Sequence, residues 1–323
     1  MNRKFGNRAA VYVENGDVLA LPKMTEGGLM MELYLDCLPC MLKQVLEAAR
    51  LVTDDEELQE TIMCQAFEEY TKKPHRYAPE VCENMHAIVK QYTGSSDPYA
   101  EVKMRDIQIA LSLEGALRDT LRDASDPFVT ALKIAATGNV MDSAIYSGRY
   151  LESFLKEELD MPFAICDDVP FKEELEKAKR IMIIGDNAGE TVFDKILARH
   201  LSTDHQVIYA VRDEAIINDV TLMDALCVGM DNFATIVSTG CGAPGAVLET
   251  CSEEFLTLFH DADIVISKGQ GNYEALSDTS RSIFFLLKAK CPKIAKSIGV
   301  SVNDYVFKEK TEVNQMPWMK GDM

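Results

Sequence analysis

IMIIGDNAGE, residues 181–190, is the stretch that decides the fold. It starts with the continuous apolar run IMIIG, and runs of the same kind recur downstream. They are VIYAV (207–211), FATIV (233–237), DIVIS (263–267) and SIFFL (282–286). Because strands covered on both faces read as continuous apolar runs, these segments predict a buried sheet. Helical spacing separates the runs, for example at Val192, Ile196 and Leu197. The β-α-β-α-β order therefore predicts an α/β fold with a doubly wound, mostly parallel sheet.

Upstream of this sheet the apolar spacing is helical. Leu38, Leu42 and Val45 fall on one helix face, and comparable spacing continues along the chain. A helix that includes Phe128 should end at Gly138 in a left-handed cap. We expect an all-helical subdomain over residues 31–178 and an α/β domain that holds the metal and phosphate sites over residues 179–323.

The first 30 residues read as a separate appendage. VYVENGDVLAL, residues 11–21, contains two β-rich segments around Asn15-Gly16. Both residues of that pair tolerate the positive φ that a type I′ turn needs. We therefore expect a small N-terminal β-hairpin within residues 1–30.

The composition excludes several classes of protein. A chain of 323 residues with 47% hydrophobic residues can bury a substantial core. It contains no apolar run near the roughly 20 residues of a membrane span. Its formal charge of −19 opposes nucleic-acid binding. Nine cysteines without regular spacing, and no secretory signal pattern, indicate free thiols in a reducing cytoplasm.

Polar segments follow the predicted strands directly. They read GDNAGE (185–190), RDEAIIND (212–219), STGCGAPG (238–245) and SKGQGN (267–272). Ligands of doubly wound sheets bind outside the carboxyl ends of the strands. These four segments should therefore meet at one functional edge.

Asp186, Asn187 and Asp219 are the candidate metal ligands. Neighbouring strand ends lie within about 5 to 10 Å of each other, so one cation can bridge both carboxylates. Hard oxygen donors select Mg²⁺, Mn²⁺ or Ca²⁺ over zinc. Two ordinary readings stay open: Asn187 or Glu190 serves the N-terminus of a helix, and Asp219 is an N-cap.

Ser267, Lys268 and Gly269 have the chemistry of a phosphate site. They offer a hydroxyl, an ammonium and exposed backbone N–H groups at the end of another strand. Ser238 and Thr239 can add further donors. The competing readings are a solvated lysine and an ordinary glycine-rich turn.

The segments GDNAGE, INDVT (217–221) and KGQGNYE (268–274), in this order, resemble the damage-control phosphatases, formerly domain of unknown function 89. CLPC (37–40), DPY (97–99) with Lys103, and AATGNVMD (135–142) resemble the branch with a paired-cysteine motif. The resemblance covers about residues 32 to 310.

The resemblance implies a helical subdomain beside an α/β domain and hydrolysis of small phosphorylated metabolites with Mg²⁺, Mn²⁺, Ni²⁺ or Co²⁺. Asp186, Asn187 and Asp219 match the metal ligands, and Lys268 matches a phosphate-contacting lysine. Asn139 and Asp142 look like pocket residues, although spacing alone favours a helix end and a solvated turn for them.

The hypothesis for the reaction is that the metal polarises a phosphoryl oxygen and acidifies a water for in-line attack. An alternative is that a carboxylate, Asp186 or Glu190, attacks phosphorus or acts as the general base. Lys268 would neutralise charge in the transition state. Spacing leaves these alternatives open.

Cys37 and Cys40 lie on one face at the start of a helix, where the positive helix end favours thiolate. Three roles stay open: a structural metal site with Cys64 and Cys82, redox cycling, and plain packing. Metal content of Cys37→Ser compared with the parent protein distinguishes them.

Three other functions compete with the phosphatase. A dinucleotide-binding enzyme would need the G-x-G-x-x-G spacing, which GDNAGE lacks. A nonenzymatic module would bind phosphometabolite or metal without turnover. An adenosylmethionine-dependent carboxyl methyltransferase would use an acidic strand end, such as Asp213, as its ribose contact.

Overall fold

The computed structural model describes residues 12–14, 17–19, 34–71, 78–138 and 151–310. The chain divides into two compact units, residues 1–30 and 31–323. In the first unit, β1 (Tyr12–Glu14) and β2 (Asp17–Leu19) pair antiparallel, as the predicted hairpin requires. The expected turn at Asn15-Gly16 lies outside the described residues.

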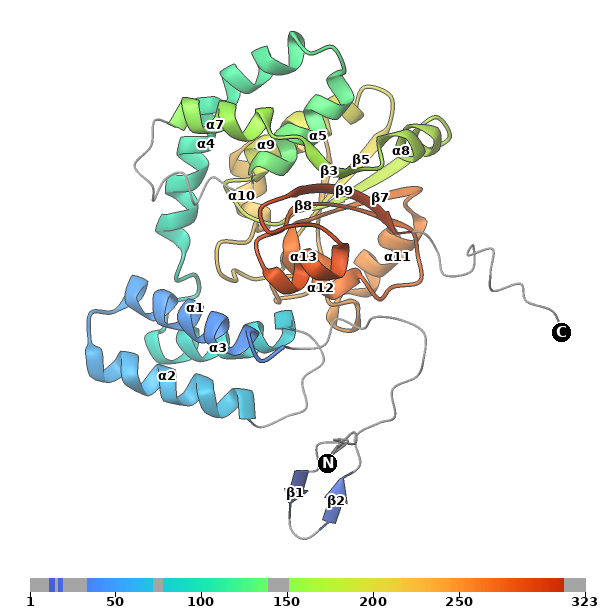
Figure 1. The fold of residues 1–323 in the computed structure, drawn as a ribbon. Coiled ribbons are helices and arrows are strands. Elements are labelled where there is room, and N and C mark those ends of the chain that lie inside the picture. The colour runs from blue at the N-terminus through green and yellow to red at the C-terminus, as the bar shows by residue number, and fades with distance from the viewer. Residues whose placement is uncertain (1–11, 15–16, 20–33, 72–77, 139–150, 311–323) are drawn as a thin grey trace, which may run out of the picture. The chain divides into compact units, whose positions relative to one another are not determined.

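The second unit contains a sheet of seven described strands in the order β3-β9-β8-β7-β4-β5-β6 (Figure 1). The strands are β3 (Phe163–Cys166), β4 (Arg180–Ile184), β5 (Gln206–Val211), β6 (Thr235–Ser238), β7 (Ile264–Lys268), β8 (Ile283–Lys288) and β9 (Tyr305–Lys310). β4 to β8 are mutually parallel, and β9 runs antiparallel to β8. The mostly parallel α/β fold is therefore confirmed.

Two strands of this sheet, β3 and β9, were not predicted from the sequence. β3 has only four residues, none of them fully buried, and β9 ends in the charged residues Lys308, Glu309 and Lys310. Their positions on one side of the sheet explain the weak signal, since β3 pairs only with β9. The stretch expected to be helical through residue 178 thus contains one strand of the sheet.

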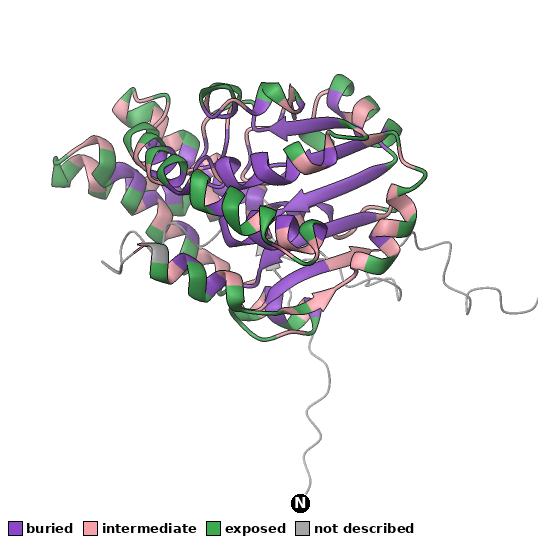
Figure 2. Cartoon of the chain, turned by 90° about the horizontal axis from the view of Figure 1, so that it is seen from above, coloured by how far each residue is buried: buried purple, intermediate pink, exposed green. Residues whose placement is uncertain are grey.

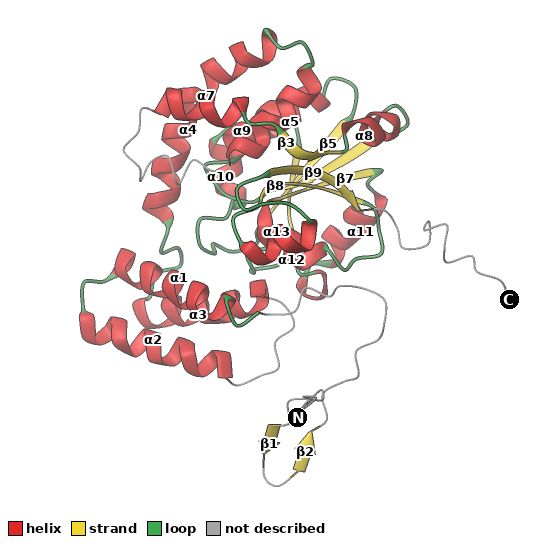
Figure 3. Ribbon diagram, in the orientation of Figure 1, coloured by secondary structure: helices red, strands yellow, loops and turns green. Residues whose placement is uncertain are grey.

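Helices cover both faces of the sheet (Figure 3). They are α1 (Cys37–Val52), α2 (Glu56–Thr71), α3 (Ala78–Thr93), α4 (Ala100–Arg122), α5 (Pro127–Thr137), α7 (Leu151–Asp160), α8 (Asp168–Leu175), α9 (Thr191–Leu201), α10 (Leu222–Cys227), α11 (Glu253–Asp261), α12 (Gly269–Leu276) and α13 (Pro292–Ile298). In the part of the chain that is described, no helix has the length and apolar character to span a bilayer.

The central strands are buried on both faces, which explains their continuous apolar sequences (Figure 2). In β4, Ile181 and Ile183 pack with α5 and α9, whereas Met182 and Ile184 pack with α11 to α13. Each fully buried side chain of this size contributes about 1.5 to 3 kcal/mol. The sheet edge is thereby a rigid platform for the loops that follow its strands.

A third hydrophobic cluster joins α1, α2 and α3, where Val45, Ile62 and Met85 are fully buried. Ile217, from the loop between β5 and α10, packs against this cluster. The three helices therefore support a loop at the functional edge of the sheet.

Gly138 does not form the predicted left-handed cap. Its φ is −52° and its ψ −33°, in the right-handed helical region. The glycine is required by close packing instead, because an added Cβ would lie 2.8 Å from Cγ of Glu190 and 3.1 Å from Cβ of Phe193. Gly138 thus lets the end of α5 approach α9.

Candidate active site

The loops after β4 and β5 pair with each other at the carboxyl edge of the sheet. The amide of Val220 donates to the carbonyl of Asp186 at 2.8 Å, and the amide of Ala188 donates to the carbonyl of Asn218 at 2.8 Å. Asn187 and Asp219 are direct antiparallel bridge partners. This short ribbon brings all three predicted metal ligands to the wall of one pocket.

The loop carrying Asp219 has an unfavourable backbone conformation. Ile217 adopts φ +46°, which is costly for a β-branched residue. Its contacts with the α1–α3 cluster offset that cost. The N-cap of α10 is Thr221, whose side chain and Asp224 form a capping box. The reading of Asp219 as the N-cap is therefore wrong.

Asp219 is paired with a cation, Arg212, that the strand-end motifs did not indicate. Arg212, at the end of β5, donates from Nε to Oδ2 of Asp219 at 2.8 Å, and its side chain is fully buried. Its Nη1 and Nη2 groups make no hydrogen bond with any described residue. In the sequence, the position of Arg212 directly after the apolar run VIYAV was the signal that could have indicated a buried cation at this strand end.

Lys103, part of the DPY-containing motif, supports the same loop from α4. Its ammonium lies 2.8 Å from Asp97 and 2.7 Å from Asp224, the residue that caps α10. The side chain is only 4% exposed. This bridge anchors the start of α10, and with it the Asp219 loop, to the helical part of the unit.

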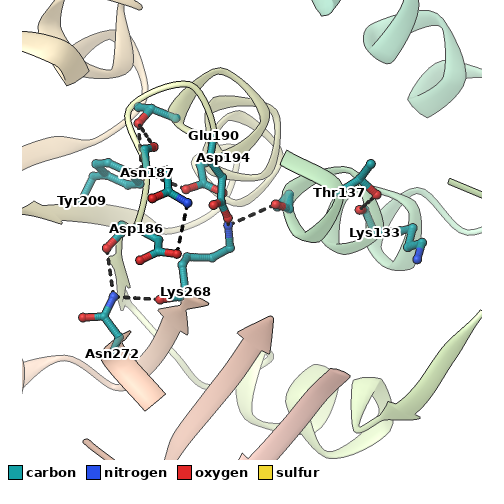
Figure 4. A network of polar contacts seen from close by, with 12 residues as sticks. Lys133, Thr137, Asp186, Asn187, Glu190, Asp194, Tyr209, Lys268 and Asn272 are labelled. Atoms are coloured by element: carbon teal, nitrogen blue, oxygen red, sulfur yellow. Dashed lines mark hydrogen bonds and ion pairs between the residues drawn. The ribbon is translucent and has the colours of Figure 1, made fainter. Parts of the chain in front are cut away.

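Asp186 lies against the N-terminus of α12. A Cβ on Gly269 would lie 1.9 Å from Oδ2 of Asp186, and Gly269 has φ +76°. Asn272 donates from Nδ2 to the carbonyls of Gly185 at 2.9 Å and of Lys268 at 2.7 Å, so the ends of β4 and β7 are joined (Figure 4). Glycine at 269 is therefore required by both conformation and space.

Burial raises the pKa of both candidate ligand carboxylates, and the two groups repel each other. Burial, and then the charges of Asp219 and Glu190, raise the pKa of Asp186 well above its usual value. Burial raises the pKa of Asp219 to about 6 even though Arg212 opposes the shift. A positive charge between them would relieve this repulsion.

The donor set fits a hard divalent cation. It comprises two carboxylates and the side-chain amide of Asn187, all oxygen donors of the kind that Mg²⁺ and Mn²⁺ prefer. Among the described residues no group of three or more His, Cys, Asp or Glu side chains has a metal-binding arrangement. A cation held here would therefore need the Asn187 side-chain oxygen beside the two carboxylates.

Lys268 lies beneath these residues and is fully buried (Figure 4). Its ammonium donates to Glu190, to Asp194 and, at 3.1 Å, to the carbonyl of Ala135. Burial alone would lower the pKa of Lys268, but the Asp194 and Glu190 carboxylates outweigh it and raise the value. Asp194, which also accepts from Tyr209 at 2.8 Å, was not singled out in the sequence.

Glu190 is the N-cap residue of α9, but its side chain makes no capping hydrogen bond. Its carboxylate accepts from Lys268 instead and is 1% exposed. Glu190 therefore does stand at the N-terminus of α9, but its carboxylate serves Lys268 and not the helix amides. Neither Glu190 nor Lys268 is among the described residues that line the pocket.

The remaining predicted substrate contacts lie apart from the pocket wall or outside the described chain. Ser238 donates to Asp213 at 2.6 Å, and Thr239 is buried and accepts from the amide of Cys241. The Ser267 hydroxyl is buried without a hydrogen-bond partner among the described residues. Asn139 and Asp142 lie outside the described residues.

The pocket has a volume of about 440 Å³ and is bounded by α1 and α3 on one side and by the sheet-edge loops on the other. Cys37 and Cys40 both line it. Burial raises the pKa of each of these thiols, so the expected thiolate-favouring environment is not present. The thiol of Cys82 is buried and donates a hydrogen bond to Oε1 of Gln44, whereas Cys64 is exposed on α2.

Substitution of Gly269 by Ala is expected to weaken metal binding and to lower the free energy of unfolding by more than 1 kcal/mol, about the cost of one strained backbone residue. Gly94→Ala is the matched control, because Gly94 has φ +71° and no atom within 4 Å of an added Cβ. Chemical denaturation and Mn²⁺ titration measure both effects. Equal losses in the two variants would refute the role of close packing at Asp186.

The sequence matches a family model over most of this unit. Residues 33–306 match the model of the damage-control phosphatase ARMT1-like domain. The chain belongs to this family. The predicted resemblance to this family is thereby confirmed, whereas the branch with the paired-cysteine motif stays a prediction. The family match includes the α1–α3 cluster and the sheet up to the start of β9.

Archaeal relatives support the assignment over most of their length. An uncharacterised protein of Methanocaldococcus jannaschii is 33% identical over 284 residues, which cover 84% of this chain and 93% of the relative. Proteins named damage-control phosphatase are 34% identical in Archaeoglobus fulgidus and 32% identical in Pyrococcus horikoshii. The matches cover 84% of this chain in both cases, and 97% and 95% of the relatives.

A solved structure has the same fold. The crystal structure of a DUF89 family protein from Pyrococcus horikoshii superposes with a TM-score of 0.78 at 31% identity. The superposition covers 85% of this chain and 98% of that one. The α/β fold of this ARMT1-like protein is therefore shared with a member studied by crystallography.

Proposed function

We propose that this ARMT1-like protein is a divalent-metal-dependent phosphatase that hydrolyses small phosphorylated metabolites. The observation that carries the proposal is the backbone ribbon pairing Asn187 with Asp219, which gathers two buried carboxylates and an amide at the pocket wall. The names of the Archaeoglobus and Pyrococcus relatives support the phosphatase role.

Asp186, Asn187 and Asp219 would hold the cation, with Mn²⁺, Mg²⁺, Co²⁺ and Ni²⁺ as the candidates. A cation bound there supplies Lewis-acid stabilisation of charge on a phosphoryl oxygen. Arg212 keeps Asp219 ionised and oriented through its Nε hydrogen bond. Gly269 leaves space for the Asp186 carboxylate.

Glu190 and Lys268 act together below the pocket. Their ion pair, extended by Asp194, fixes the end of β7 against α9. Asp186 and Glu190 are the two carboxylates that could attack phosphorus or act as the general base. Of these two, only Asp186 is among the described residues that line the pocket. The geometry therefore supports Asp186 in that role and a positioning role for Glu190.

The pocket supports a small substrate. Its volume of about 440 Å³ lies near the lower end of the usual range for ligand sites, roughly 300 to 1,000 Å³. Met41, Val102 and Ile217 give it an apolar part beside the carboxylates. A phosphate monoester with a compact organic group matches both parts.

The alternatives receive less support. A methyltransferase would use Asp213 for the ribose, but its carboxylate accepts a hydrogen bond from Ser238. A nonenzymatic module that binds phosphometabolite or metal would have the same residues and release no phosphate. Turnover separates that module from the proposed enzyme.

Metal removal is the direct test. Treatment with EDTA should abolish hydrolysis of a chromogenic phosphate monoester, and added Mn²⁺ or Co²⁺ should restore it, because the carboxylates alone repel an anionic substrate. Phosphate release is measured before and after chelation, with Ca²⁺ and Zn²⁺ as comparison ions. Full activity in the chelator would eliminate the mechanism.

A further inference from the structure

The charge distribution around the pocket is markedly unbalanced. Its described lining includes the acids Asp36, Glu47, Asp186, Asp219 and Glu274. Among the described lining residues, only Lys290 carries a positive charge. A phosphate monoester is a dianion near neutral pH, so under the proposed function it needs a cationic contact from the protein in addition to the metal ion.

The predicted phosphate-contacting lysine has no hydrogen atom to offer. A lysine ammonium has three donor hydrogens. Lys268 directs its ammonium to three acceptors, the carboxylates of Glu190 and Asp194 and the carbonyl of Ala135. Contact with a substrate would require one of these buried bonds to break, which is costly for a charged group.

The other cations nearest the site are engaged in the same way. Arg212 is fully buried behind Asp219, and Lys103 bridges two aspartates at the start of α10. Neither lines the pocket. Both hold the loop that presents Asp219, so their charges are used to organise the site.

Lys290 differs from these residues in its exposure and its partners. It follows β8, it is exposed, and its ammonium makes no hydrogen bond or ion pair with a described residue. Its backbone is nevertheless held firmly. Oε1 of Gln270 accepts from the amides of Lys290 at 2.6 Å and of Cys291 at 3.0 Å.

This anchor relates Lys290 to the Asp186 carboxylate. Gln270 directly follows Gly269, where an added Cβ would lie 1.9 Å from Oδ2 of Asp186. Asp186, Gln270 and Lys290 all line the same pocket. The exposed Lys290 and the Asp186 carboxylate therefore belong to the wall of one pocket.

We infer that Lys290 is the cation that contacts the phosphoryl group of the substrate, while Lys268 is confined to holding Glu190 and Asp194. The inference rests on the proposed phosphatase function and adds the residue that recognises the phosphomonoester dianion. A flexible, exposed ammonium on an anchored backbone can reach an arriving anion without losing a bond within the protein.

Three variants test this role. Lys290→Gln removes the charge, Lys290→Arg retains it, and Lys296→Gln removes an equivalent exposed charge on α13 away from the pocket. With Mn²⁺ and p-nitrophenyl phosphate, Lys290→Gln should lower kcat/KM by about 10- to 100-fold, the value of one charge-assisted hydrogen bond. Lys290→Arg should recover most of the loss, and Lys296→Gln should match the parent.

Inorganic phosphate provides a readout that does not depend on turnover. Calorimetric titration of the Mn²⁺-loaded proteins should give a phosphate Kd at least about tenfold higher for Lys290→Gln than for Lys296→Gln. Equal phosphate affinities in these two variants, or no phosphate binding by the parent, would overturn the role of Lys290. Absence of phosphate release by a parent that binds phosphate through Lys290 would instead refute only the proposed enzymatic function.

Discussion

Asp186→Asn is expected to lower kcat/KM by about 1,000-fold or more in the presence of Mn²⁺. If Asp186 is the metal ligand proposed above, loss of its carboxylate removes several kcal/mol of transition-state stabilisation, and each 1.36 kcal/mol corresponds to a factor of ten. The metal-free variant should be at least as stable as the parent. The neutral amide has nearly the same size and no longer repels Asp219 and Glu190, the charges that surround Asp186.

Paired thermal melts and rate measurements separate these effects. A ligand at 100 times its Kd stabilises a protein by about 2.7 kcal/mol, so saturating Mn²⁺ should raise the Tm of the parent and leave that of Asp186→Asn nearly unchanged. Asp261→Asn is the control, because this aspartate is 56% exposed on α11. Parental Mn²⁺ stabilisation and turnover in Asp186→Asn would remove Asp186 from the metal site.

Arg212→Met is expected to reduce the free energy of unfolding by about 3 to 5 kcal/mol. The substitution leaves the buried Asp219 carboxylate without its partner, and breaking a buried ion pair from one side has costs of this size. The side chains of Arg212 and Asp219 are 0% and 5% exposed, so solvent offers little compensation. Urea denaturation without metal measures the loss.

Two further variants establish that the pair, and not the side-chain volume, is responsible. Arg122→Met removes an arginine that is 67% exposed and paired with Asp119, and should cost less than about 1 kcal/mol. The double variant Arg212→Met, Asp219→Asn should be more stable than the sum of the single losses predicts. Strict additivity would contradict the coupling between Arg212 and Asp219.

The apolar runs predicted the central sheet, and the strand-end motifs predicted that Asp186, Asn187 and Asp219 lie close together. Both follow from local information, because a strand buried on two faces must be apolar throughout and parallel strands present their carboxyl ends at one edge. β3 and β9 gave no such run, since β3 is short and partly exposed and β9 ends in charged residues. The same criterion therefore failed on that side of the sheet.

The roles of individual charged residues depended on partners far away in the chain. Lys268 meets Glu190 and Asp194 across 78 and 74 residues, and Lys103 meets Asp224 across 121. No local pattern reports such partners. A lysine in a glycine-rich loop reads as free to bind phosphate until its donors are seen to be occupied.

By itself, the sequence indicated the family, the buried strands and the proposed set of oxygen donors, because motif order and apolar periodicity are local properties of the chain. Tertiary structure alone decided that Asn187 pairs with Asp219, that Arg212 neutralises Asp219 and that Lys268 is enclosed while Lys290 is exposed. These outcomes depend on which surfaces pack together. A buried charged group loses its water and needs a specific protein partner, so burial decides whether it is still available to a ligand.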